Sequence, residues 1–500
     1  MMPHISDPES IFDPAWENEQ AAAESAVRDV EESFGTIHPL IIGGDRIITD
    51  RTITSLNPSN PEEIVGELCT ADAEHADLAV KKAAEAFTEW RTVSPGQRAT
   101  DILAIANTLR SRWPELSAGL MLEAGMSWND AVDETADAID RIERTGLMLL
   151  RLTEAGPEVP CSGEVEEHGL LPRGPGLMVC ASSSPLADMA GMMAACIGSG
   201  NTVIIIPPST FPVATAYFVK FVHEAGLSPG IVNLCPVADA EMGDRLMEHK
   251  GIRYIAVCGD RESAERACTH AARPTKGSRG FKRVIADIAG STTVIVDRSA
   301  DLELAAGGIV SSAFMFQGQA STSCARLIVA ADVREKLVGL IVGLTTELAI
   351  GPTREAANDI GPVMSEDVLN RAIMAIETGR EEGRLVIGGS RIERTGWFIE
   401  PTVFVDLPQK STLVREGVSG PVLSIVDAKD AAEAIALANE INTGTCVVYA
   451  RDRARIGSAK RELDAPVIVI NRPWAEAWSD AAIKRCIMEL TVTRTIEEEQ

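Results

Sequence analysis

Several classes of protein are excluded by what the chain lacks. No apolar run reaches the ~20 residues that a membrane-spanning helix needs, and the first twenty residues have neither the basic start nor the apolar core of a signal peptide. The ten cysteines include no C-x-x-C pair and lie near no histidine cluster, so neither a disulfide framework nor a zinc site is indicated. We therefore expect a globular protein of the cytoplasm with no metal and no membrane partner.

Basic residues are also scarce relative to acidic ones. The chain has 46 Lys and Arg against 73 Asp and Glu, which gives a formal net charge of −27. Binding to a phosphate backbone requires clustered basic side chains. We expect no nucleic-acid partner, and the acidic surface indicates solubility and nothing more specific.

What the chain does have is length, and 500 residues are too many for one ordinary core. The first third is mostly helical. It predicts a helix over 16–34, a hairpin over 38–48 with Gly43 and Gly44 at its turn, a turn at Asn57, a helix over 73–90, and a helical region over 95–152 that starts at Ser94 and is interrupted at Gly125.

From Gly174 onward, short apolar strands alternate with helices, which is typical of a parallel sheet with crossover connections. Strands are predicted at 177–180, 202–206, 231–234 and 254–257, and helices at 185–197, 210–225, 242–249 and 262–272. This α/β pattern suits a dinucleotide-binding architecture. A second α/β block follows from Val284, with helices at 302–316, 333–348, 366–382 and 430–439. A terminal strand is predicted over 487–496, with a partner distant in sequence or in another subunit.

Motifs found in order along the chain carry a resemblance to a known family. They include L-N-P-S-N-P from Leu56, P-R-G-P-G-L-M-V from Pro172, H-E-A-G-L-S-P-G-I-V-N from His223, G-W-F-I-E-P-T from Gly396 and V-I-N-R from Val469. The chain resembles the aldehyde dehydrogenase superfamily, and most closely its branch that oxidises L-glutamate γ-semialdehyde in proline breakdown.

The resemblance implies a Rossmann-type cofactor domain, an α/β catalytic domain and a small β flap that pairs subunits. Applied to this chain, it predicts four units. They are an N-terminal helical lead at 1–36, an NAD-binding-like domain at 37–155 and 173–285, a catalytic-like domain at 286–480, and an oligomerisation flap at 156–172 and 485–500.

Family members attack the aldehyde with a cysteine thiolate, and the position that matches this nucleophile is Ser321, in F-M-F-Q-G-Q-A-S. A free thiol with pKa near ~8.5 keeps some thiolate at neutral pH, whereas an alcohol has essentially no alkoxide without an adjacent base. Cys324 lies three residues later. Cys324 is a candidate for a displaced nucleophile. Because ~1 Å of misplacement can cost about a hundredfold in rate, the pattern favours the other reading, a buried small residue.

Two further catalytic positions are altered. Ser183 stands where the family has the asparagine of P-W-N-F-P that donates to the tetrahedral oxygen, and its shorter, rotating hydroxyl is a weaker preorganised donor. Asp287 matches the acidic residue of E-x-G-G-K and keeps a carboxylate that is shorter by one methylene.

The positions that match cofactor contacts are altered as well. Ile206 replaces the lysine of K-P-A-S, although Ser209 of that element is present. Gly417 replaces the glutamate of E-x-F-G-P that holds the nicotinamide ribose. Gly259 is kept from the F-T-G-S turn, but Asp260 beside it places a carboxylate where an anionic pyrophosphate would approach.

The loop that would cradle the substrate also departs from the family, because Arg472 leads to P-W-A-E-A-W, in which Glu476 would oppose a substrate carboxylate. The first hypothesis is therefore a non-catalytic member of the family, with no cofactor, which assembles with itself as a dimer or larger oligomer or with an active dehydrogenase. The second is an NAD-dependent dehydrogenase with a rearranged site, or a Ser321-dependent esterase. The third is ligand sensing in the leftover cleft through Arg326 and Asp287.

Overall fold

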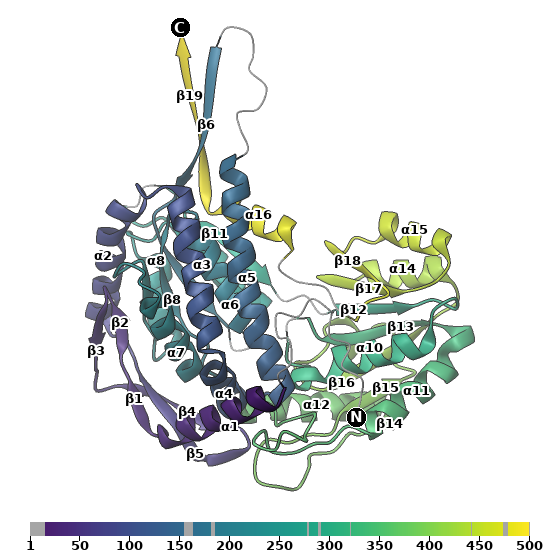
Figure 1. Ribbon diagram of the computed structural model, residues 1–500. Coiled ribbons are helices and arrows are strands. Elements are labelled where there is room, and N and C mark those ends of the chain that lie inside the picture. Colours follow the sequence, from purple (N-terminus) through teal and green to yellow (C-terminus); the bar gives the residue numbers. More distant parts are fainter. Residues whose placement is uncertain are drawn as a thin grey trace.

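The structure is a computed structural model that describes residues 16–154, 164–181, 186–277, 280–288, 292–320, 322–441, 443–473 and 479–499. It has two α/β lobes side by side and a two-stranded arm that projects from one of them (Figure 1). None of the described helices combines the length and apolarity needed to cross a bilayer.

The first lobe is built on a seven-stranded sheet. Its strand order is β11 (Arg283–Ile288), β10 (Tyr254–Gly259), β7 (Pro175–Cys180), β8 (Thr202–Ile206), β9 (Val232–Leu234), β2 (Leu40–Ile42) and β3 (Asp45–Ile47). The strands from β11 to β9 are parallel, and the β2–β3 hairpin adds antiparallel strands at one edge. The order reverses between β7 and β10, and such switch points are where open α/β sheets bind ligands.

Helices cover both faces of this sheet, which explains why its strands read as unbroken apolar runs. One face carries α2 (Ala73–Trp90), α8 (Ala240–Glu248) and α9 (Arg261–Ala271), and the other carries α3 (Pro95–Ser111), α5 (Trp128–Glu154), α6 (Leu186–Gly198) and α7 (Pro212–Glu224). Along β8, Ile204 and Ile206 pack on the first face while Val203 and Ile205 pack on the second. Alternate side chains of a strand point to opposite faces, so both halves of the run are buried.

The N-terminal elements complete this lobe. Helix α1 (Trp16–Glu32) packs Ala26 and Val30 on Ala118 and Leu122 of α4 (Trp113–Ala124). A small sheet joins β1 (Thr36–His38), β5 (Asn60–Cys69) and β4 (Thr52–Asn57). The lead that precedes Trp16 lies outside the described residues.

The second lobe has its own seven-stranded sheet, in the order β14 (Arg384–Ile387), β15 (Thr402–Val405), β16 (Val422–Ala428), β13 (Cys324–Ala330), β12 (Thr292–Val296), β17 (Thr445–Tyr449) and β18 (Val467–Ile470). Only β14 runs antiparallel to its neighbour. One face carries α10 (Leu302–Phe314) and α11 (Arg334–Thr346), and the other carries α12 (Glu366–Glu382), α14 (Ala431–Asn439) and α15 (Arg453–Glu462). The short elements η1 (Met315–Gly318), η2 (Ala331–Val333) and α13 (Thr412–Arg415) lie in its connections.

The predicted terminal strand over 487–496 was wrong in its first part. Ile487 belongs to α16 (Asp480–Glu489), where it is buried against the first lobe, and the strand β19 begins only at Thr491 and ends at Glu499. An alternating pattern is shared by a strand and by one face of a short helix, so the boundary could not be read from periodicity. The predicted distant partner of this strand is present, since β19 pairs antiparallel with β6 (Glu164–Pro172) in the same chain.

Most other elements agree with the prediction. Helices α2 and α12 have the predicted bounds, and Ser94 caps α3 by accepting from the backbone N–H of Gln97. The predicted helical region over 95–152 is three helices. It breaks at Arg112 as well as at Gly125, which ends α4 in the left-handed conformation (φ 73°). The division of the chain into domains stays a prediction, and β11 crosses the expected boundary after Ile285.

A buried carboxylate joins α4 to the start of α7. Glu123 is 1% exposed and accepts hydrogen bonds from the backbone N–H groups of Val213 (2.8 Å) and Ala214 (2.6 Å) and from the Ser55 hydroxyl (2.6 Å). Burial raises the pKa of Glu123 from 4.5 to about 7, and these hydrogen bonds only partly oppose the rise.

This raised pKa predicts how Glu123→Gln changes stability with pH. The folded chain keeps the Glu123 proton up to about pH 7, while the unfolded chain loses it near pH 4.5. The unfolding free energy therefore falls as the pH rises from 4.5 to about 7. Relative to the wild type, Glu123→Gln should therefore gain on the order of 3 kcal/mol of unfolding free energy between pH 5 and 7.5. Urea unfolding at a series of pH values measures the difference.

The expected quantity is the difference in unfolding free energy between Glu123→Gln and the wild type, because other groups change stability with pH in the opposite direction. His38, for example, has its pKa lowered from 6.5 to about 4, first by burial and then by Arg46 and Lys220, and this term cancels between variant and wild type. Glu89→Gln, on the exposed surface of α2, is the matched control. A pH-independent difference for Glu123→Gln would contradict the assignment.

Candidate functional site

The carboxyl edge of the first sheet meets the amino edge of the second. Strand β11 ends at Ile288 and β12 starts at Thr292, so only three residues separate the last position of one sheet from the first position of the other. Such a short connection forces the two edges to face each other. We call this region the junction.

The junction gathers the predicted site positions from distant parts of the chain. On the first sheet, Val179 pairs with Ile206, and Cys258 pairs with both Cys180 and Asp287, so Ile206, Gly259 and Asp287 lie at neighbouring strand ends. The Asp287 side chain is not described. On the second sheet, Cys324 opens β13, and the segment that contains Gly417 leads into β16.

Three predicted elements lie outside the described residues. These are Ser183, Ser321 and the substrate-loop stretch that contains Glu476. Their neighbours in the chain are described and are held in place by groups from both lobes.

The turn before position 321 has an unusual backbone. Phe316 (φ 47°), Gln317 (φ 53°) and Gly318 (φ 65°) are all left-handed, a conformation that costs a residue with a side chain roughly 1–2 kcal/mol. The predicted helix over 302–316 ends at Phe314 for this reason. A strained turn of this kind persists only where the surrounding structure holds it.

Both lobes hold this turn. Asp130 of α5 is 7% exposed and accepts from the backbone N–H of Phe316 (2.9 Å). From the second lobe, the Gln319 side chain accepts from the N–H of Met364 (2.9 Å) and donates to the carbonyl of Phe316 (3.1 Å). Gly318 packs directly on the carbonyl of Gly420, leaving no space for a side chain. The turn is therefore a fixed link between the lobes, made without the residue at 321.

Burial also changes the proton affinity of Asp130. Its pKa is raised from 3.8 to about 7, because removal of the carboxylate from water outweighs the hydrogen bonds from Phe316 and Ser127. Sequence reasoning missed both Asp130 and Glu123. Glu123 did leave a signal, since it is the one charge in the apolar run G-L-M-L-E-A-G, whereas Asp130 looks like any acidic residue in the first turn of a helix.

Cys324 has the surroundings of a core residue. It is 1% exposed in a cluster with Phe314 and Val294, and its thiol donates to the carbonyl of Arg326 (3.3 Å). Burial raises its pKa from 9.0 to about 12. Thiolate is the form that attacks carbonyls, and a thiol with this pKa forms almost no thiolate at neutral pH. Cys324 is therefore a poor nucleophile.

Carboxylates of the protein itself occupy the helix N-termini along the carboxyl edge of the first sheet. Glu134 of α5 accepts from Ala187 N–H (2.7 Å) in the first turn of α6, and Glu123 caps α7 as described above. Asp239 accepts from Met242 N–H (2.9 Å) in α8, and Asp260 accepts from Ser263 N–H (2.7 Å) in α9. A free helix N-terminus attracts phosphate groups, but in these four helices carboxyl side chains of the protein already accept from first-turn N–H groups.

Two glycines show how tightly the positions matching cofactor contacts are packed. Gly259 (φ 135°) lies so close to Ala181 that a side chain would overlap the Ala181 methyl group. Gly417 (φ 69°) is left-handed, and a Cβ atom there would lie 2.7 Å from the Cβ of Ala325. Ile206 is 7% exposed in the core between the sheet and its helices, and Ser209 is exposed.

Arg326 fixes the backbone just before Gly417. Its guanidinium is 1% exposed and donates to the carbonyls of Val414 and Arg415 (3.2 Å) and to the Thr293 hydroxyl (2.8 Å). Burial lowers its pKa from 12.5 to about 10, so the group stays charged. Arg326 thus supports the segment from α13 to Gly417. Because its guanidinium is buried, it is not available to bind a ligand, as the sensing hypothesis requires.

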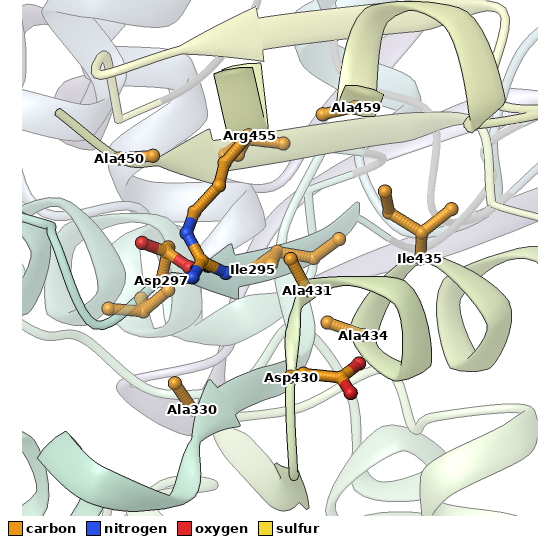
Figure 2. Close-up of a pocket in the computed structure, with 12 residues that line it drawn as sticks. Ile295, Asp297, Ala330, Asp430, Ala431, Ala434, Ile435, Ala450, Arg455 and Ala459 are labelled. Atoms are coloured by element: carbon orange, nitrogen blue, oxygen red, sulfur yellow. Dashed lines mark ion pairs between the residues drawn. The ribbon is translucent and has the colours of Figure 1, made fainter. Parts of the chain in front are cut away.

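A separate small cavity lies at the opposite, carboxyl edge of the second sheet. Its volume is about 20 Å³, space for about one water molecule. Asp297 and Arg455 form an ion pair (3.1 Å) on its wall, and Ala431, Ala434 and Ile435 line the rest (Figure 2). Among the described residues, no group of His, Cys, Asp and Glu side chains is arranged to hold a metal ion.

The doubly wound first sheet and the second α/β lobe joined to it at the junction define an α/β protein with a dinucleotide-binding type of fold. Residues 47–482 match the model of the aldehyde dehydrogenase family. The chain belongs to the aldehyde dehydrogenase family, as the sequence motifs predicted.

Named relatives indicate a branch of this family. The chain is 38% identical to a 1-pyrroline-5-carboxylate dehydrogenase of Geobacillus kaustophilus over 465 residues, 93% of this chain and 90% of the relative. A 1-pyrroline-5-carboxylate dehydrogenase from Thermus with bound NAD is 34% identical, with a TM-score of 0.91 over the full length of both chains. Proline utilization A of Bdellovibrio bacteriovorus is 26% identical with a TM-score of 0.92, over 99% of this chain and 54% of that one. The predicted fold class is therefore confirmed.

Restoring a side chain at position 417 should destabilise the protein. Gly417→Ala forces a left-handed residue against Ala325, and we expect a loss of roughly 1–3 kcal/mol, with Gly417→Glu at least as costly. Thermal unfolding measures the effect. The matched control is Gly339→Ala in α11, where a Cβ meets nothing within 4 Å and the helix should gain up to ~1 kcal/mol. Equal melting temperatures for the position-417 variants and the wild type would show that the segment accommodates a side chain.

Proposed function

We propose that this protein is a member of the aldehyde dehydrogenase family that does not oxidise aldehydes and acts by assembly, with copies of itself or with an active dehydrogenase. The observation that carries the proposal is the burial of Cys324, together with the raised pKa of its thiol. The sequence places serine at 321, and the cysteine nearest to it in the chain is enclosed in the core with a pKa of about 12.

The residues at the junction do not fit NAD. A dinucleotide needs a donor for its ribose and an uncapped helix N-terminus for its pyrophosphate. Here Ile206 has no donor, Asp260 presents a carboxylate at the start of α9, and Gly417 is held in a conformation that disfavours the family's glutamate. We therefore assign no reaction step to NAD in this protein.

The arm supports an assembly role. Strands β6 and β19 form a ribbon of nine residue pairs that extends away from the first lobe (Figure 1). An isolated two-stranded ribbon is marginally stable in water at best, so this one calls for a covering surface. A projecting ribbon is a common means of joining subunits. We propose that this assembly forms in the cytoplasm.

The second candidate is NAD-dependent oxidation of L-glutamate γ-semialdehyde through a rearranged site, or Ser321-dependent ester hydrolysis. It is favoured by the relatives, which are named 1-pyrroline-5-carboxylate dehydrogenases, one of them with bound NAD. The two candidates differ in cofactor affinity and turnover, and both quantities can be measured on the purified chain.

Titration with NAD and an activity assay test the proposal. We expect no binding tighter than about 1 mM by calorimetry. We also expect no NADH formation from L-glutamate γ-semialdehyde, with the Geobacillus kaustophilus relative as positive control. Ser321→Cys should remain inactive, because a thiol restores none of the groups at 183, 206 or 417. Micromolar NAD affinity together with turnover by the wild-type chain would establish the second candidate instead.

A further inference from the structure

A buried carboxyl group links the two lobes at the turn before position 321. Asp130, in the first turn of α5, is 7% exposed, and its side chain accepts from the backbone N–H of Phe316 in η1 (2.9 Å). Phe316 and Gln317 have left-handed backbones, so this turn persists only where other groups hold it. Asp130 therefore supplies a hold on the turn from the first lobe.

The surroundings of Asp130 contain no balancing positive charge. Among the described residues, no basic side chain lies within ion-pair distance of its carboxyl group. Arg141 follows on the same face of α5, but about three turns later, which is about 16 Å along the helix axis. It is already paired with Asp137 of α5 and Asp188 of α6. The positive charge on this face of α5 is therefore committed elsewhere.

The groups closer to Asp130 are neutral or acidic. Its carboxyl group contacts the Phe316 N–H of η1 and Ser127 at the start of α5, neither of which is charged. The charge that acts on Asp130 is the carboxylate of Asp133 on the same helix, and it repels a negative charge on Asp130. Glu134, one turn further along α5, is also acidic and accepts from the N–H of Ala187.

These surroundings make the two states of the turn bind a proton with different affinity. While the turn is closed, burial and the charge of Asp133 raise the pKa of Asp130 from 3.8 to about 7. If the turn moves away, water reaches the carboxyl group, and its pKa returns toward the ordinary value. A change of pH must then shift the balance between the closed and the open turn.

We propose that Asp130 is a proton-operated latch between the two lobes, closed on Phe316 while Asp130 is protonated and released as Asp130 ionises. The closed turn binds the proton more tightly, so its advantage is complete below about pH 4 and is lost as the pH rises to about 7. The latch couples pH to the backbone that precedes position 321. It goes beyond the proposed function, because it operates whether or not the chain oxidises aldehydes.

Hydrogen exchange of the Phe316 amide in the full-length chain measures the latch. After correction for the pH dependence of exchange in an unstructured peptide, the equilibrium constant for opening should rise by up to about tenfold per pH unit between pH 5.5 and 7. The control is the amide of Ala450, which is 0% exposed and donates to the neutral side chain of Asn471 (2.9 Å). Its opening constant should not follow this rise.

Three variants identify the group that titrates. Asp130→Asn keeps an oxygen that accepts from Phe316 but has no titratable proton, so its opening constant should be independent of pH. Asp133→Asn removes the repelling charge and should move the rise to lower pH. Asp29→Asn, on the exposed surface of α1, is the matched control and should leave the wild-type profile unchanged.

A wild-type opening constant at Phe316 that does not change with pH overturns the latch. An Asp130→Asn variant that keeps the wild-type slope overturns it too, because another group then titrates. If Asp130→Asn does not fold, the wild-type profiles decide, since equal rises at Phe316 and Ala450 would mean that the whole chain opens and the turn does not act alone. None of these results changes the expected absence of NAD binding and turnover, so the latch and the proposed function fail separately.

Discussion

Carboxyl side chains of α4 and α5 hold the backbone around the junction of the two sheets. Glu123 and Glu134 accept from the first N–H groups of α7 and α6, and Asp130 accepts from the N–H of Phe316 in the other lobe. Helix N-termini and left-handed turns leave backbone donors without local partners, and an enclosed donor must be satisfied from elsewhere. In the described structure, these three side chains provide that satisfaction. The conformation of the junction therefore depends on two helices that precede the parallel strands of both sheets in the chain.

This arrangement separates the shape of the junction from its chemistry. The turn at Phe316 and Gln317 is set by Asp130, by Gln319 and by the close approach of Gly318 to Gly420, and none of these contacts involves position 321. A change of nucleophile leaves those contacts in place. At Gly417 the relation is different, because the backbone itself has a conformation in which the family's glutamate would be strained. The fold can thus persist while individual reactive positions change independently.

How much of the site could be predicted depended on the kind of interaction at each residue. The substitutions at Ser321, Ile206 and Gly417 were visible in the sequence because local motifs identify those positions. The capping role of Asp260 was partly visible, since a carboxylate directly before a helix is a local signal. Asp130 could not be found, because its partner lies 186 residues away and nothing near it marks the contact.

The sequence by itself determined the α/β class, the alternation of strands and helices, and the family, since these follow from hydrophobic periodicity and from motifs a few residues long. The tertiary structure alone decided that Cys324 is enclosed and that β19 begins at Thr491 and pairs with β6. Burial and pairing are set by segments hundreds of residues apart. Local patterns do not encode which distant surface will cover a given side chain.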